Sequence, residues 1–221
     1  MKRTLISPGI LIVILFSCEE NNISESDNNC LEKHYYYEQS EKISIGSNIL
    51  QNYIFIGFDY SATNSEIYSF IEDEATLDSN FEVEINEYNI NSKKALCKFT
   101  SSMNCSEIKN IIEKFYKNEI VIFASYVYDC DMLFGGVQYD YMSYSDEFLV
   151  KVENSDNLDE LNTIADQTGT IVKSEVYMMP NWYTLSSNKN SQGNALEMAN
   201  FFYETGKFKN AVPNFYRIEL E

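Results

Sequence analysis

The sequence has 221 residues, of which 34 are acidic and 16 are basic, so its formal net charge is −18 at pH 7. This charge argues against binding to nucleic acid and against direct docking on anionic lipid, because both require cationic patches. A chain of this length allows one large domain or two small ones.

The first residues have the features of a lipoprotein signal peptide. Lys2 and Arg3 give a positive start, and the apolar run at 10–16 is too short to span a membrane. The letters LFSC, which end at Cys18, resemble a lipoprotein signal box, although Phe16 is bulkier than that pattern usually has. We therefore predict a signal peptide over 1–17 and a lipid anchor on Cys18. An ordinary cleaved signal and an uncleaved anchor are the alternatives.

Residues 18–34 are rich in Glu, Asn and Ser and are predicted to form a flexible tether. The pair Glu19-Glu20 resembles the acidic signals that send some Gram-negative lipoproteins to the cell surface, and the start of a solvated linker explains it equally well. The expected location is the cell envelope, at the outer membrane, on its periplasmic or its surface face.

From residue 35 the chain shows one pattern twice. Four helix starts share a capping Thr or Asn with a Glu three residues later, at Thr63/Glu66, Asn104/Glu107, Asn157/Glu160 and Asn194/Glu197. Strands are expected at 54–58, 81–88, 95–99 and 121–128, and again at 148–152, 171–177, 182–185 and 211–218. Pro213 lies inside the last strand, which indicates an edge or a bulge.

This order predicts an α+β fold of two tandem ferredoxin-like (β-α-β-β-α-β) units with antiparallel sheets. The first unit covers 35–130 and begins with a short hairpin, and the second covers 147–221. A connector at 131–146 lies between them. Its alternating tyrosines are consistent with an exposed contact surface or with a short β-hairpin.

A resemblance to a known family rests on Pro180–Tyr183 (PNWY) and Gly193–Asn200 (GNALEMAN). These motifs resemble the N-terminal prodomain of secreted subtilisin-like serine peptidases, in the fervidolysin-like group. The resemblance is closest over 147–215 and weaker from residue 35 onward. It implies a ferredoxin-like domain that covers a peptidase, assists its folding and blocks its cleft.

The family would continue into a catalytic domain where this sequence stops, at Glu221. The resemblance therefore implies a partner supplied in trans, a subtilisin-like peptidase that the protein inhibits or helps to fold. In the family the last strand leads a tail into the peptidase cleft. The matching residues are Asn214, Phe215, Tyr216, Arg217, Ile218, Glu219, Leu220 and Glu221.

The sequence offers no catalytic or metal-binding motif, and we predict a non-catalytic protein without cofactors. His34 is the only histidine and lies beside the predicted tether, so we expect it at the surface. Asp129-Cys130-Asp131 lacks a second cluster of ligands, and Asn154, Asp156 and Asp159 lack the Gly and the twelfth-position Glu of a calcium loop.

With Cys18 lipidated, four cysteines remain, and their pairing stays open: Cys30, Cys97, Cys105 and Cys130. The alternatives to peptidase binding are a cell-surface module that binds protein or glycan, and a truncated, non-functional peptidase remnant.

Overall fold

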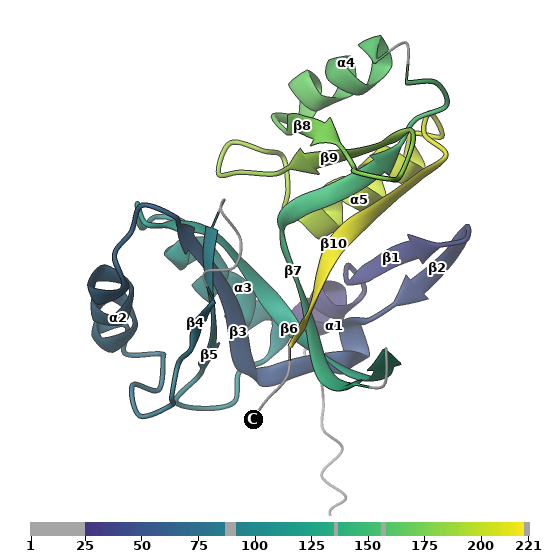
Figure 1. Cartoon of the computed structure of the whole chain (residues 1–221). Coiled ribbons are helices and arrows are strands. Elements are labelled where there is room, and N and C mark those ends of the chain that lie inside the picture. Colours follow the sequence, from purple (N-terminus) through teal and green to yellow (C-terminus); the bar gives the residue numbers. More distant parts are fainter. Residues whose placement is uncertain (1–24, 87–91, 135–136, 156–157, 219–221) are drawn as a thin grey trace, which may run out of the picture.

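The fold is an α+β arrangement in which five helices accompany a mostly antiparallel, eight-stranded sheet (Figure 1). A computed structural model describes residues 25–86, 92–134, 137–155 and 158–218. The predicted signal peptide at 1–17 and the predicted lipid anchor Cys18 lie outside these ranges. The strand order is β4-β5-β3-β6-β7-β9-β8, and β10 pairs with β7.

Two sets of elements make up this architecture. The helices are α1 (Glu25–Leu31), α2 (Asn64–Asp73), α3 (Cys105–Phe115), α4 (Asp159–Thr168) and α5 (Ala195–Glu204), with a 3-10 turn at Gly46–Asn48. The strands of the large sheet are β3 (Ile49–Asp59), β4 (Ile85–Asn86), β5 (Ser92–Lys98), β6 (Val121–Phe134), β7 (Val137–Lys151), β8 (Ile171–Glu175), β9 (Trp182–Ser186) and β10 (Asn210–Ile218).

The chain follows the same path twice. Its first half, from β3 to β6, has the order β4-β5-β3-β6, and its second half, from β7 to β10, has the equivalent order β8-β9-β7-β10. All of these pairings are antiparallel. The predicted sequence of elements is therefore present in both halves.

The two halves share one sheet, so the prediction of separate sheets is wrong. The segment predicted as a connector belongs to β6 and β7, which pair as a hairpin with Tyr128 opposite Met142 and Asp129 opposite Tyr141. The hairpin alternative is thus the one observed. Beyond this pairing β6 turns towards β3 and β7 towards β9 and β10, as Figure 1 shows.

Two buried serines satisfy the backbone at the point where β6 and β7 separate. The Ser125 hydroxyl donates to the carbonyl of Tyr144 at 2.7 Å, and the Ser143 hydroxyl donates to the carbonyl of Tyr126 at 2.7 Å. The two hydroxyls lie 2.9 Å apart. These bonds replace the main-chain ladder that the diverging strands no longer form, because a buried polar group without a partner is costly.

Helix α1 and a small hairpin precede the large sheet. The hairpin pairs β1 (Tyr35–Glu38) with β2 (Glu41–Ser44), as predicted. The prediction of a flexible tether up to residue 34 is wrong for α1. This short helix is held against α3, where the Asp27 carboxylate accepts a hydrogen bond from the backbone N–H of Ser106 at 3.1 Å.

The helix starts confirm most of the predicted caps. Helices α2, α3 and α5 each begin with a complete capping box, formed by Thr63/Glu66, Asn104/Glu107 and Asn194/Glu197. Asn157, predicted to cap α4, lies outside the described residues, and Leu158 is in the N-cap position without a side-chain bond. Gly169 and Gly206 follow α4 and α5 with positive φ angles of 68° and 70°, which favour glycine.

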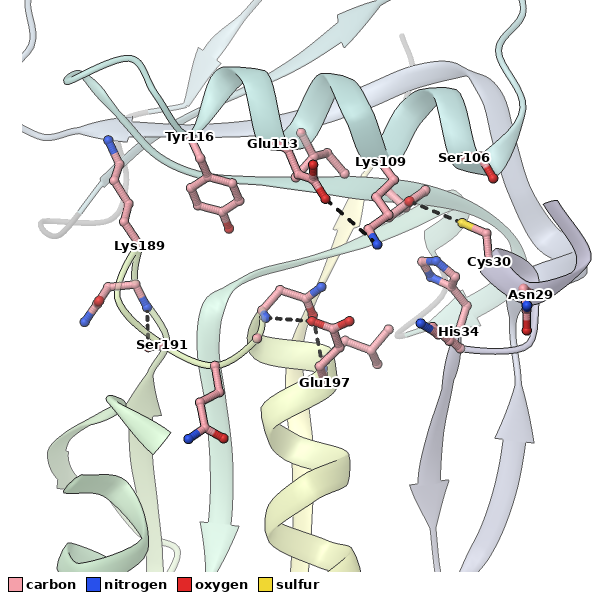
Figure 2. A pocket seen from close by; sticks show the side chains of 18 of the residues that line it. Asn29, Cys30, His34, Ser106, Lys109, Glu113, Tyr116, Lys189, Ser191 and Glu197 are labelled. Atoms are coloured by element: carbon pink, nitrogen blue, oxygen red, sulfur yellow. Dashed lines mark hydrogen bonds and ion pairs between the residues drawn. The ribbon is translucent and has the colours of Figure 1, made fainter. Parts of the chain in front are cut away.

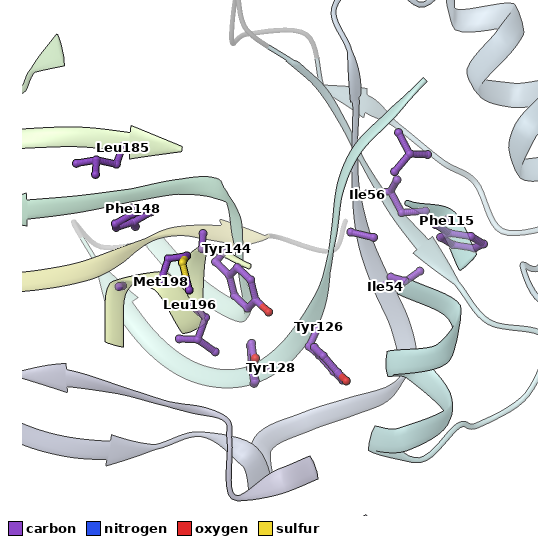
Figure 3. Packing of buried hydrophobic residues seen from close by; sticks show 14 of the residues in the cluster. Ile54, Ile56, Phe115, Tyr126, Tyr128, Tyr144, Phe148, Leu185, Leu196 and Met198 are labelled. Carbon is purple, nitrogen blue, oxygen red and sulfur yellow. The ribbon is translucent and has the colours of Figure 1, made fainter. Parts of the chain in front are cut away.

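One continuous hydrophobic core joins the halves. Three buried tyrosines, Tyr126, Tyr128 and Tyr144, lie between Ile54 of the first half and Phe148 of the second (Figure 3). The rings of Tyr128 and Tyr144 are 6.4 Å apart, one from each long strand. A smaller cluster around Phe55, Phe123 and Val127 covers the opposite face of the first half.

Candidate functional site

A cavity of about 610 Å³ opens between α1, α3 and the segment that leads into α5 (Figure 2). Lys109 and Glu113 project into it from α3, with the ammonium and carboxylate 3.9 Å apart. Glu197 approaches from α5, and Lys189 stands on the far side. The cavity therefore combines charged groups of both signs from segments distant in sequence.

His34 lies in the wall of this cavity, so the expectation of a surface histidine is wrong. Its side chain is 6% exposed, and Nδ1 shares a hydrogen bond with the Tyr128 hydroxyl at 2.7 Å. The ring also meets Tyr126 edge-on, with the ring centres 4.3 Å apart. Burial lowers the pKa of His34 to about 4, because the charged form loses its hydration. The imidazole is therefore neutral at pH 7.

A disulfide joins Cys30 of α1 to Cys105 at the start of α3. Next to it, the Tyr126 hydroxyl donates to the Cys105 carbonyl at 3.1 Å. Cys97 is buried and free. The sequence left this pairing open, since four cysteines allow three connectivities.

The second half of the sheet has an outer face, on the side opposite α4 and α5, and this face is partly apolar. Val212, Leu149 and Thr184 form one row across β10, β7 and β9, and all three are half-buried. Trp182 lies opposite Lys151 in the neighbouring row, with the ammonium 5.7 Å from the ring centre. The alternate residues of these strands point to the other face, where α4 and α5 complete the core.

The loop between β8 and β9, at the end of this sheet and directly before Trp182, carries exposed apolar side chains. Tyr177 is 89% exposed and Met178 is 83% exposed. Met178 also has a φ of +60°, a conformation that costs energy for a residue with a side chain. The loop closes onto β9 through the N–H of Trp182, which donates to the Met179 carbonyl at 3.1 Å. Exposed apolar groups on a strained loop are typical of a binding site.

The predicted peptidase-binding tail begins inside the sheet. Residues 214–218 belong to β10, which pairs with β7 after a bulge between Pro213 and Phe215, as the proline indicated. The ring centres of Phe215 and Tyr36 are 5.1 Å apart, and those of Tyr216 and Phe55 are 5.9 Å apart. The buried Lys94 ammonium stands 4.7 Å from the centre of the Tyr216 ring. Residues 219–221 lie outside the described residues.

A half-buried carboxyl of β7 gives a prediction of pH dependence. Burial raises the pKa of Asp146 to about 6, and the neighbouring Glu147 charge adds to the shift, while Lys173 and Lys94 oppose it. The unfolded chain releases this proton near pH 4, before the folded chain does, so stability falls as the pH rises from about 4 to 6. We expect Asp146→Asn to stabilise the protein by about 1–3 kcal/mol at pH 7.5.

Urea unfolding at pH 4 and pH 7.5 tests this prediction. The gain should be largely absent at pH 4, because Asp146 is protonated in the folded protein and still about half-protonated in the unfolded chain at that pH. Glu119→Gln, which removes an exposed carboxylate from the loop before β6, is the control and should change little at either pH. An equal gain in stability from Asp146→Asn at both pH values would contradict a raised pKa of the Asp146 carboxyl.

No protein-family model matches the chain, and no curated protein matches it significantly. None of the helices that the structure describes is long and apolar enough to cross a membrane.

Proposed function

We propose that each half of the chain is a ferredoxin-like unit, and that the second binds a subtilisin-like peptidase through the outer face of its sheet. The protein acts on this partner in trans, as an inhibitor or a folding helper. The observation that carries the proposal is the apolar surface formed by the outer face and the loop at Tyr177 and Met178.

Two further features support this choice of partner. The strand order β8-β9-β7-β10, with both helices packed into the core on the inner face, is the ferredoxin-like order. One of the two motifs that carry the resemblance to subtilisin prodomains borders the same surface, because Pro180–Tyr183 ends the exposed loop and begins β9, while Gly193–Asn200 leads into α5 on the other face. A sheet face half-covered by apolar groups suits a partner that completes its burial.

The outer face, rather than the tail, supplies most of the binding in this proposal. Residues 214–218 already use their main chain to pair with β7, so they are unable to enter a cleft without leaving the sheet. Any insertion into the cleft involves residues from Glu219 onward. Removing Tyr216–Glu221 would therefore disturb the fold as well, because Tyr216 packs on Phe55.

A titration of peptidase activity tests the proposal. The partner is a subtilisin-like peptidase from the same organism, prepared without its own prodomain. We expect the wild-type protein to inhibit it, and Met178→Ser combined with Leu149→Lys to weaken inhibition at least tenfold. Phe201→Ser is the matched control, since Phe201 is 42% exposed but lies on α5, away from the outer face.

Three results would count against the proposal. If the wild-type protein inhibits no such peptidase, the proposed partner is wrong. Equal loss in the control variant moves the contact to the helical side of the second half. Full inhibition by the double variant means that the outer face is not the contact. Circular dichroism on each variant shows that the fold is retained.

The proposed location is the cell envelope, with the protein anchored through lipid on Cys18. We expect Cys18→Ala to release the protein from membrane fractions, because the short apolar run of the signal is unable to hold it alone. The measurement is fractionation followed by carbonate extraction. A variant that still sediments with membranes and resists carbonate would contradict the lipid anchor.

A row of aromatic rings favours glycan binding as a second candidate function. On the outer face of the first half, the Tyr53 ring lies 5.9 Å from Phe81 and 5.8 Å from Tyr141, and all three are half-buried. Flat aromatic surfaces of this kind can stack on sugar rings. Retention on polysaccharide gels that Tyr53→Ala abolishes, and that the exposed control Tyr68→Ala preserves, would support this candidate.

A further inference from the structure

Three side chains with metal-binding atoms meet in the wall of the cavity. The sulfurs of Cys30 and Cys105 and a ring nitrogen of His34 all lie within 4.8 Å of one another. Cys30 comes from α1, His34 from the turn after it, and Cys105 from the first turn of α3. We infer that Cys30, Cys105 and His34 form a redox-controlled site for a zinc-type divalent cation, closed by the disulfide and opened by a thiol reductant.

The donor set suits this class of ion. Zinc binds thiolate at about 2.3 Å and imidazole at about 2.0–2.1 Å in tetrahedral geometry, so its ligand atoms stand about 3.5–3.8 Å apart. The three atoms already lie within reach of that arrangement, and the Cα atoms of the two cysteines are 6.0 Å apart. Small rotations of the two cysteine side chains after reduction would complete the geometry.

The histidine is held in the orientation that a ligand needs. In the tautomer with its proton on Nδ1, His34 donates to the Tyr128 oxygen at 2.7 Å, and Nε2 carries the lone pair. Tyr128 is itself fully buried, which fixes the ring. Among the residues that the structure describes, Tyr128 is the hydrogen-bond partner of this ring, so the second nitrogen remains available to a cation.

The reaction balances with a dithiol as the reductant. The disulfide accepts two electrons and two protons, which yields two protein thiols, while the dithiol is oxidised to its own disulfide. The cation then displaces the two thiol protons, binds both thiolates and the imidazole, and leaves a fourth position open to the cavity. Either cross-link, the disulfide or the metal, ties α1 to α3.

Cobalt(II) binding to the purified full chain tests the inference. Protein reduced with a phosphine, which is oxidised to its oxide, should bind one equivalent of Co²⁺ and show a thiolate-to-cobalt charge-transfer band, and Zn²⁺ should displace the cobalt. Oxidised protein should show no band. Cys30→Ser and His34→Gln should each weaken binding at least tenfold, whereas Cys97→Ser, which changes a buried free cysteine elsewhere, should have no effect.

A measurement on the wild type guards against variants that fail to fold. Zn²⁺ should slow alkylation of Cys30 and Cys105 in reduced protein, as identified by mass spectrometry, and leave the rate at Cys130 unchanged. Reduced protein without a cobalt band, an equal band in oxidised protein, or zinc protection of Cys97 or Cys130 in place of the pair would overturn the inference.

Discussion

Replacing Phe202 by alanine should lower the free energy of unfolding by roughly 3–5 kcal/mol, because the change deletes a fully buried ring and leaves a cavity. The side chain is 0% exposed, and its ring lies 5.2 Å from Phe148 and 5.4 Å from Phe208. It therefore packs α5 against both the sheet and the segment that leads into β10. Urea unfolding followed by circular dichroism measures the loss.

Phe201 provides the matched control, because it is the adjacent residue of the same helix and is exposed. Phe201→Ala should change the free energy of unfolding by no more than about 0.5 kcal/mol. A similar loss in both variants would show that α5 is packed differently from the structure described above. A loss under about 1 kcal/mol at Phe202 would contradict its place in the core.

Removing the disulfide should also lower the free energy of unfolding by a large amount. Cys30 and Cys105 are separated by 75 positions, and closing a loop of this length in the unfolded chain stabilises the folded state by about 4.5 kcal/mol in the chain-entropy model. We expect Cys30→Ala with Cys105→Ala to lose most of this amount under non-reducing conditions. Thermal or urea unfolding of the metal-free protein measures it.

A reductant supplies the control for this experiment. It should lower the stability of the wild type towards that of the double variant and leave the double variant unchanged. Cys97→Ala retains the disulfide and should keep the response to reductant. A double variant as stable as the oxidised wild type, or one that responds to reductant itself, would contradict the pairing.

The local signals in the sequence predicted the elements well. Thr63, Asn104 and Asn194 each have a Glu three residues later, and this spacing fixed three helix starts because both groups satisfy backbone N–H donors within one turn. Pro213 marked the bulge in β10, since proline lacks the N–H that a regular ladder needs. These features depend only on neighbours in the chain, which the sequence displays directly.

The long-range features were beyond such signals. Tyr128 and Met142 are ordinary strand residues, and nothing local shows that the hairpin they belong to joins both halves into one sheet. His34 looked like part of a polar lead-in, and its burial depends on Tyr128 and on the Cys30–Cys105 bond. Helix α1 was also missed, because the sequence before residue 35 is polar. This helix is stabilised by its contact with α3, which is distant in the sequence.

The central claim, that the outer face of the second half binds a subtilisin-like peptidase, is most directly tested by hydroxyl-radical footprinting. The complex would be formed with a peptidase whose catalytic serine is replaced by alanine, so that neither chain is cleaved. We predict that Tyr177, Met178 and Trp182 become protected from oxidation in the complex, while Phe201 on α5 reacts as in the free protein. Unchanged oxidation at Tyr177 and Met178, or protection confined to Phe201, would contradict the claim.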